Sequence, residues 1–212
     1  YSSFVNYTYL VIDPASNRAV IVDPAWRMDK IELALTNSKA VLDAVLITHA
    51  HPDHVHLARP LATAHNCPIL MSKEEIEVSG YGARQLIGID GAPWTVGDMH
   101  VRPIFTPGHS AGSVCYLIHE SVFTGDTLFS EGCGLCSDTE SAYAMFASLE
   151  RLKKEVMPHI RVYPGHSYGT PPGMEFGQIM RKNMYLSFKS KEDFAAYRLR
   201  KQQAYSKYFK FA

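Results

Sequence analysis

Four residues whose side chains bind metals in proteins lie within six positions of one another: His49, His51, Asp53 and His54. They directly follow residues 41–47, a short apolar run whose β-branched residues favour an interior strand. Residues that emerge at the end of such a strand lie where clefts form. A buried strand that ends in this pattern predicts a metal site.

The spacing within this segment indicates that it can serve two metals. Side chains at positions i and i+2 of an extended segment project to the same side, which places His49 and His51 together. Asp53 and His54 begin the next helical pattern and can point elsewhere. Neutral imidazoles suit zinc and iron, and a carboxylate adds charge compensation and suits harder metals such as manganese.

Three later segments supply further residues of ligand type. Each is an apolar, strand-like run that ends in a glycine followed by a potential ligand: Gly108 and His109, Gly125 and Asp126, and Gly165 and His166. Glycine lets the backbone turn sharply and bring the following side chain inward. We therefore expect these segments to converge on one point.

The ordered motifs His-x-His-x-Asp-His, Pro-Gly-His, Thr-Gly-Asp and Gly-His resemble the metallo-β-lactamase superfamily, specifically its glyoxalase II-like branch. The resemblance extends from residue 6 to about residue 186. It implies two zinc ions, with iron or manganese as alternatives, and seven ligands: His49, His51 and His109 on one ion, Asp53, His54 and His166 on the other, and Asp126 as the bridge. Asp23 matches a family acid that holds the ligands in place without binding the metal itself. True β-lactamases have a cysteine in place of Asp126, so lactam hydrolysis is not expected.

The resemblance also implies an α/β fold, a four-layer αββα metallo-β-lactamase sandwich with a short C-terminal helical extension. We expect residues 1–170 to form the catalytic domain and residues 171–212 to form the helical extension, packed on the same domain. The sequence pattern fits such layers: strands at 7–12, 19–22, 41–47, 68–71, 100–105, 114–118, 121–124 and 160–163, and helices at 28–36, 54–65 and 140–156. Residues 80–93, with four glycines, are expected to form a loop at one wall of the cleft.

The chemistry implied by such a site is hydrolysis of an acyl compound by a metal-bound hydroxide. Two neighbouring cations lower the pKa of a shared water toward about 7 and polarise a carbonyl group. Asp53 and Asp126 are the expected catalytic residues, which position the hydroxide and take up its proton. A thioester is an especially suitable substrate, because its thiolate leaving group needs little protonation.

The identity of the thiol depends on departures from the family pattern. Glutathione-dependent relatives continue Gly-Cys-Gly with Lys or Arg, whereas here Leu135 follows Gly134. A closer resemblance, carried by residues 53–57, 164–169 and 183–186, is to the stand-alone acyl hydrolases of bacterial polyketide synthase clusters. Their substrate is an acyl group on the phosphopantetheine of a carrier protein. We therefore predict a metal-dependent hydrolase of that thioester, with acyl carrier protein as its partner.

Three alternatives remain open at the level of sequence. One is glyoxalase II, a hydroxyacylglutathione hydrolase. The second is a mononuclear iron persulfide dioxygenase, which would use His49 or His51 with His109 and Asp126. The third is a non-catalytic binding protein that has kept the fold, against which the intact ligand set argues.

Several residues of reactive type are better explained without metal chemistry. His65, His100, His119 and His159 are isolated, and a lone histidine is usually an ordinary surface or core residue. His56 stands two positions after His54, and a role other than ligand is favoured for it. Cys133 and Cys136 form a Cys-x-x-Cys pair, but there is no second pair to complete a tetrahedral zinc site.

Composition is typical of a single soluble domain. The chain has 212 residues, of which 46% are hydrophobic, and no apolar run is as long as the roughly 18 residues of a membrane span. Four cysteines in a chain of this length do not suggest a disulfide framework, so we expect a cytoplasmic protein. No charged and then apolar leader is expected either.

The net charge of zero hides an uneven distribution. Residues 181–212 contain nine Lys or Arg against two acidic residues, a balance of +7, and residues 1–180 contain 12 against 19, a balance of −7. Interleaved aromatic residues suggest an amphipathic helix with an outward basic face, including Arg198, Arg200 and Lys201. Such a face is either a solvated surface or a dock for an acidic carrier protein. Nucleic acid is not the expected partner, since no recognition motif accompanies the charge.

Overall fold

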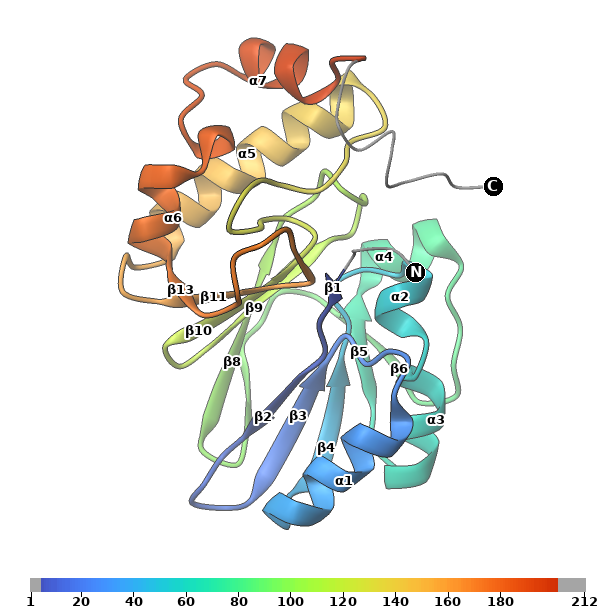
Figure 1. Ribbon diagram of the computed structural model, residues 1–212. Helices are drawn as coiled ribbons and strands as arrows, with labels where there is room; N and C mark the ends of the chain where they lie inside the picture. The colour runs from blue at the N-terminus through green and yellow to red at the C-terminus, as the bar shows by residue number, and fades with distance from the viewer. Residues whose placement is uncertain (1–4, 202–212) are drawn as a thin grey trace.

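The computed structural model describes residues 5–201, which form two β-sheets packed face to face with helices on both outer surfaces (Figure 1). This arrangement is the expected αββα sandwich. None of the helices within residues 5–201 is long and apolar enough to cross a membrane.

The first sheet has five strands in the order β2-β3-β4-β5-β6. The strands are β2 (Tyr9–Ile12), β3 (Arg18–Val22), β4 (Val41–Leu46), β5 (Ile69–Ser72) and β6 (Leu86–Ile89). All neighbours except β2 and β3 are parallel, so β4 and β5 end at the same edge. The connecting helices are α1 (Met28–Ser38), α2 (Pro52–Val55), α3 (Ala58–His65) and α4 (Lys73–Ser79).

The second sheet has six strands in the order β13-β11-β10-β9-β8-β7. They are β7 (Trp94–Val96), β8 (Met99–Phe105), β9 (Val114–Ile118), β10 (Ser121–Gly125), β11 (Arg161–Pro164) and β13 (Met174–Glu175). Its outer helices are α5 (Thr139–Glu155), α6 (Phe176–Lys182) and α7 (Lys191–Arg198), with a 3-10 turn at Met184–Leu186. A separate antiparallel pair joins β1 (Val5–Asn6) to β12 (His166–Ser167).

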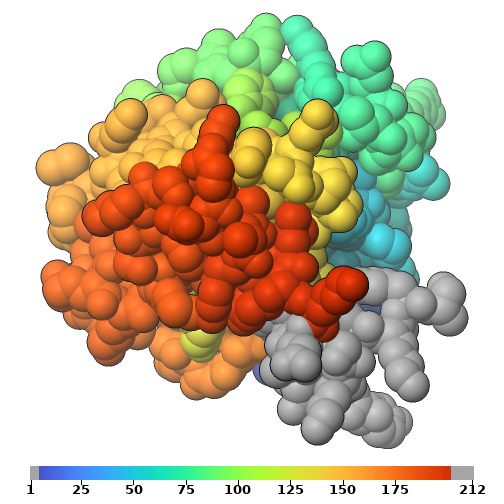
Figure 2. Space-filling model, turned by 90° about the horizontal axis from the view of Figure 1, so that it is seen from above, coloured from blue at the N-terminus to red at the C-terminus, as the bar shows by residue number. Residues whose placement is uncertain are grey.

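Three hydrophobic clusters fill the spaces between the four layers. Strand alternation explains how one strand serves two of them: in β3, Val20 and Val22 face the core between the sheets, and Ala19 and Ile21 face the cluster that includes α1 and α3 residues. A third cluster packs the second sheet against α5, α6 and α7, and it includes Phe194 of the C-terminal extension. Figure 2 shows the extension, in orange and red, lying against α5, in yellow.

The expected helix over residues 54–65 is wrong, because the structure has two helices there. α2 begins at Pro52, where proline suits the first helical position, and α3 begins at Ala58. Pro60 has no N–H to bond the carbonyl four residues earlier, so it is tolerated only in a first turn. This proline therefore separates α2 from α3.

Residues 80–93 and the C-terminal extension also differ from expectation. The segment 80–93 contains β6, the edge strand of the first sheet, instead of being a loop throughout. α4 and β7 were not expected from the sequence. The single amphipathic helix expected after residue 181 is instead the end of α6, the 3-10 turn and α7, and residues 202–212, with Tyr205, Lys207, Tyr208, Phe209 and Lys210, lie outside the described part.

Candidate metal centre

The predicted convergence of the motifs is observed. The segments that follow β4, β8, β10 and β11 meet at one end of the sandwich, and they bring together all seven predicted residues. Three groups have ligand atoms within 4.8 Å of one another: His49, His51 and His109; Asp53, His54 and His166; and His49, His54 and Asp126. The first two are the sets expected for the two ions, and Asp126 groups with one histidine from each.

Two glycines show why the backbone can approach so closely. Gly125 adopts a φ of +48°, and a Cβ there would lie 2.3 Å from the Thr48 hydroxyl. A Cβ on Gly165 would lie 2.6 Å from the His54 ring and 2.7 Å from Asp126 Oδ1. Any other residue at either position would displace the site.

In four histidines, the ring nitrogen that points away from the centre forms a hydrogen bond with a neighbouring group. His54 Nδ1 lies 2.9 Å from Asp23 Oδ2, and His109 Nδ1 donates to the Leu135 carbonyl at 2.9 Å. The other two contacts are His166 Nδ1 to the Val5 carbonyl at 3.2 Å and His49 Nδ1 to the Thr48 hydroxyl at 3.1 Å. Because Thr48 Oγ1 donates its own proton to Asp23, it accepts from His49. Each inner nitrogen therefore presents a lone pair to the centre in the neutral ring.

The inner ring nitrogens of these four histidines and the Nδ1 atom of His51 lie close to one another. His51 Nδ1 lies 3.0 Å from Nε2 of both His49 and His109, and His54 Nε2 lies 3.3 Å from His166 Nε2. Lone pairs that face each other at such distances repel unless a proton or a cation lies between them. Asp126 Oδ1 adds a buried carboxylate oxygen with no hydrogen-bond partner, 3.4 Å from His54 Nε2. The donor set thus fits divalent cations such as zinc.

The electrostatics of these residues agree with this fit. Burial and the neighbouring imidazoles hold the pKa of His49 well below its usual value. Burial opposes ionisation of Asp126, but His54 and His166 outweigh it and hold the pKa of Asp126 well below the usual range. Burial likewise disfavours the His166 cation, yet Asp126 and Asp53 raise the pKa of His166 to about 10. Asp53 and Asp126 therefore stay ionised among the imidazoles at neutral pH, which favours the binding of positive charge.

Asp23 supports the centre as expected. It is 2% exposed, and its Oδ1 accepts the Thr48 backbone N–H at 2.8 Å while its Oδ2 accepts the Thr48 hydroxyl at 2.6 Å. Together with the His54 contact, these bonds fix both the segment after β4 and the ring orientation of one histidine. His56 belongs to none of the three groups among the described residues, and its Nδ1 accepts the Trp26 N–H at 3.3 Å.

Glu75 is a supporting residue that the sequence analysis missed. Its buried carboxylate accepts the Ala50 N–H at 2.8 Å through Oε1, and the Ser110 hydroxyl at 2.7 Å and the Gly112 N–H at 3.0 Å through Oε2. It therefore ties the segment of His51 to the segment of His109. The available signal was Ser72-x-x-Glu75, which resembles a helix capping box, although here the glutamate side chain turns toward these loops.

The C-terminal extension binds the loop that follows β10, next to the candidate metal centre. Arg198 is 1% exposed, and its Nε donates to the Gly134 carbonyl at 2.8 Å and its Nη1 to the Tyr185 hydroxyl at 3.1 Å. Asn183 Nδ2 donates to the carbonyls of Phe129 and Gly132 at 3.0 and 2.9 Å. The expectation that Arg198 lies on an exposed basic face is therefore wrong. It binds the loop whose Leu135 carbonyl orients His109.

The Cys-x-x-Cys pair lies in this same loop. Both thiols are free, and Cys133 is buried in the core beside the second sheet. Burial raises the pKa of Cys136 to about 11, so its thiol stays protonated at neutral pH.

Comparison with known proteins assigns the class. The family model of the metallo-β-lactamase superfamily matches residues 3–166, and the chain belongs to that superfamily.

Particular relatives refine the assignment. The chain is 44% identical to a probable polyketide biosynthesis zinc-dependent hydrolase, PksB, of Bacillus subtilis, over 96% of this chain and 91% of the relative. It is 32% identical to a probable hydroxyacylglutathione hydrolase of Schizosaccharomyces pombe, over 77% of this chain and 64% of that protein. Its fold is similar to the crystal structure of ETHE1 from Myxococcus xanthus, with a TM-score of 0.78, 28% identity, and 92% and 88% of the two chains covered.

Proposed function

We propose that this protein is a zinc-dependent hydrolase that cleaves the thioester between an acyl group and the phosphopantetheine arm of a carrier protein. The main support is the 44% identity, over almost the whole chain, to a relative described as a probable zinc-dependent hydrolase of polyketide biosynthesis. The convergence of seven donor residues at one end of the sandwich agrees with it.

The proposed ligand sets are those of the two groups described above. His49, His51 and His109 would hold one ion, Asp53, His54 and His166 would hold the second, and Asp126 would contact both. Bound zinc supplies a Lewis acid that polarises the thioester carbonyl and a water of lowered pKa.

The protein residues then orient the substrate and manage one proton. Four histidines are unsuited to proton transfer, because their outer nitrogens are engaged and their inner nitrogens face the centre. Asp53 has a side chain that is 28% exposed, so it is open to substrate and water, whereas the Asp126 side chain is 12% exposed. We assign Asp53 and Asp126 to hold the attacking water, and Asp53 to accept its proton.

The loop beside His109 argues against glutathione as the thiol. Residues 130–138 contain no Lys or Arg, and the half-buried Leu135 stands where glutathione-dependent relatives have a cation. Glyoxalase II activity is the second candidate, and the identity to a probable hydroxyacylglutathione hydrolase favours it.

The decisive experiment combines metal analysis with three thiol classes. Protein purified without chelator should contain two zinc ions per chain and should hydrolyse acyl-carrier thioesters faster than acyl-glutathione or acyl-coenzyme A. A large preference for lactoylglutathione would identify glyoxalase II instead. One iron per chain with oxygen uptake on a persulfide would identify a dioxygenase, and no turnover of any of these substrates would favour a binding protein.

Replacement of Asp126 by Ala tests the role of the shared carboxylate. We expect turnover to fall by several orders of magnitude and the zinc content to fall with it, because both proposed ligand sets lose the same donor. Leu135→Arg should leave carrier-bound substrates unchanged and improve glutathione thioesters. If Asp126→Ala retained full turnover, the proposed site would be wrong.

A further inference from the structure

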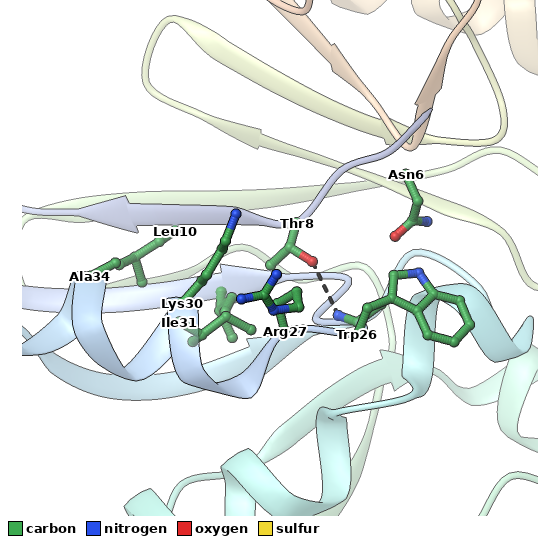
Figure 3. Close-up of a pocket in the computed structure, with 10 residues that line it drawn as sticks. Asn6, Thr8, Leu10, Trp26, Arg27, Lys30, Ile31 and Ala34 are labelled. Atoms are coloured by element: carbon green, nitrogen blue, oxygen red, sulfur yellow. Dashed lines mark hydrogen bonds between the residues drawn. The ribbon is translucent and has the colours of Figure 1, made fainter. Parts of the chain in front are cut away.

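A pocket of about 300 Å³ lies next to the candidate metal centre, between the N-terminal strands and α1 (Figure 3). Figure 3 shows Asn6 and Trp26 at one end of it, with Arg27, Lys30 and Thr8 between them and Ala34. None of the seven candidate ligands lines this pocket, so it is a separate feature of the molecule.

Asn6 connects the pocket to the centre. Its Nδ2 donates to the Asp53 carbonyl at 3.0 Å, and in the β1–β12 pair Asn6 is the direct partner of His166. Both neighbours belong to the same candidate ligand set. A ligand that occupies the pocket at Asn6 therefore lies beside the candidate metal centre.

Trp26 is held in an unfavourable conformation at the same end. Its φ is +62°, which is rare and costly for a bulky residue, and its side chain leaves the residue 55% exposed. Two contacts with His56 hold it there: the rings stack with centroids 4.9 Å apart, and the Trp26 N–H donates to His56 Nδ1. A strained, exposed indole beside a reaction centre indicates a binding surface, since packing does not require it.

The remaining walls combine cationic and apolar groups. Lys30 makes no ion pair with any residue of 5–201, whereas Arg27 is paired with Asp29. No carboxylate lines the pocket, and Leu10 and Ile31 supply apolar surface. Such a pocket fits an elongated, amphipathic ligand with a negative charge at one point.

We propose that this pocket binds the phosphopantetheine arm of the carrier-bound substrate, with the arm passing Asn6 and Trp26 and its phosphate near Lys30 and Arg27. The proposal rests on the proposed function and adds the place and chemistry of recognition. The arm has amides that match Asn6, methyl groups that match Trp26 and Ile31, and a phosphate that matches Lys30.

A binding measurement tests the pocket independently of hydrolysis. S-methyl phosphopantetheine and S-methyl pantetheine are thioethers that the enzyme does not cleave, and they differ only in the phosphate. Calorimetry on the metal-loaded protein at low salt should show roughly tenfold tighter binding of the phosphorylated compound. Lys30→Gln should remove most of that difference. Lys39→Gln, at the other end of α1 and outside the pocket, is the matched control and should keep it.

The tryptophan is tested by Trp26→Asn, because asparagine tolerates a positive φ and removes only the indole. We expect KM for an acyl-phosphopantetheine thioester to rise several-fold with kcat little changed, because the ring contributes equally to ground-state and transition-state binding. The melting temperature should stay the same or rise. A purely structural tryptophan would instead lower the melting temperature and leave KM unchanged.

Three outcomes would overturn the pocket assignment. They are equal binding of the two thioethers, an equal effect of Lys30→Gln and Lys39→Gln, and a KM effect that depends on acyl length instead of on the phosphate. The last would show that the acyl chain occupies the pocket. If the thioethers bind as expected but no thioester is hydrolysed, the proposed function fails and the pocket assignment stands.

Discussion

Asp23 shows how a single residue away from the metal-facing atoms can determine the geometry of the centre. It accepts three hydrogen bonds, two from Thr48 and one from His54, and the Thr48 hydroxyl in turn accepts from His49. The tautomers of two candidate ligands therefore depend on one buried carboxylate. Such partners typically affect metal affinity nearly as strongly as the ligands do.

We expect Asp23→Asn to lower zinc affinity roughly 10- to 100-fold, because an amide cannot accept all three bonds and can reverse the tautomer of His54. Competition with a chromophoric chelator measures this affinity. Asp13→Asn is the matched control, since Asp13 is also buried and accepts bonds from Ser16 and from backbone N–H groups away from the site. Equal losses in both variants would show a general effect of stability and would contradict a specific role for Asp23.

Secondary-structure elements connect the separate parts of the centre. α4 supplies Glu75, which joins the segment after β4 to the segment after β8. α7 supplies Arg198, which holds the loop after β10. Elements that contribute no candidate ligand therefore maintain the distances among those that do.

Glu75→Gln should destabilise the protein by about 2 kcal/mol. The new carboxamide would place its own N–H group against at least one of the three groups that donate hydrogen bonds to the Glu75 carboxylate. At roughly 2–4 °C per kcal/mol for a chain of this size, the melting temperature falls by several degrees, as calorimetry would record. Zinc affinity should fall as well. Glu74→Gln, on the exposed neighbouring residue, should change neither quantity, and an identical result for the two variants would exclude the bridging role.

Arg198→Met should cost about 2–3 kcal/mol, because it leaves the buried Gly134 carbonyl without its charged donor. The Leu135 carbonyl lies one residue further along this loop, so the orientation of His109 should loosen and zinc should dissociate faster. Arg198→Lys should restore part of both losses. Arg181→Met, on an exposed arginine of α6, is the control. Normal zinc retention in Arg198→Met would limit Arg198 to a packing role.

The features predictable from the sequence were those encoded in short stretches. The run at 41–47 and the four residues after it formed one local pattern, and glycines marked the other strand ends. Glu75 and Arg198 were not predictable, since the loop groups that they bind lie 25 or more residues away and a charged side chain usually indicates a surface position. Pro60 was visible, but its effect depends on where the helix begins.

The uneven distribution of charge over the whole molecule remains even though Arg198 is buried and does not belong to the exposed basic face. Among the described basic residues of the extension, Lys201 is exposed, and the Arg200 guanidinium lies 3.6 Å above the Tyr197 ring, where it is held near the surface. The excess of acidic residues lies in residues 1–180, whereas residues 181–212 carry a net charge of +7. The partner we propose for it is an acidic face of the carrier protein away from the serine that bears the arm, because the proposed site of the arm's phosphate is at α1 and Figure 1 shows α1 and α7 at opposite ends of the molecule.

Reversal of both charges, Arg200→Glu with Lys201→Glu, tests this partner at the scale of the assembly. We expect KM for an acyl-carrier substrate to rise at low salt and the difference to shrink at high salt, because screening weakens attraction between exposed charges. Free acyl-phosphopantetheine should be hydrolysed as before, since its contacts lie in the pocket at α1. The control reverses Lys73 and Arg84, two exposed cations beside the first sheet. If both double variants raise KM equally, net charge alone explains the effect. If the free thioester is affected as strongly as the carrier-bound one, the basic segment is not a docking surface.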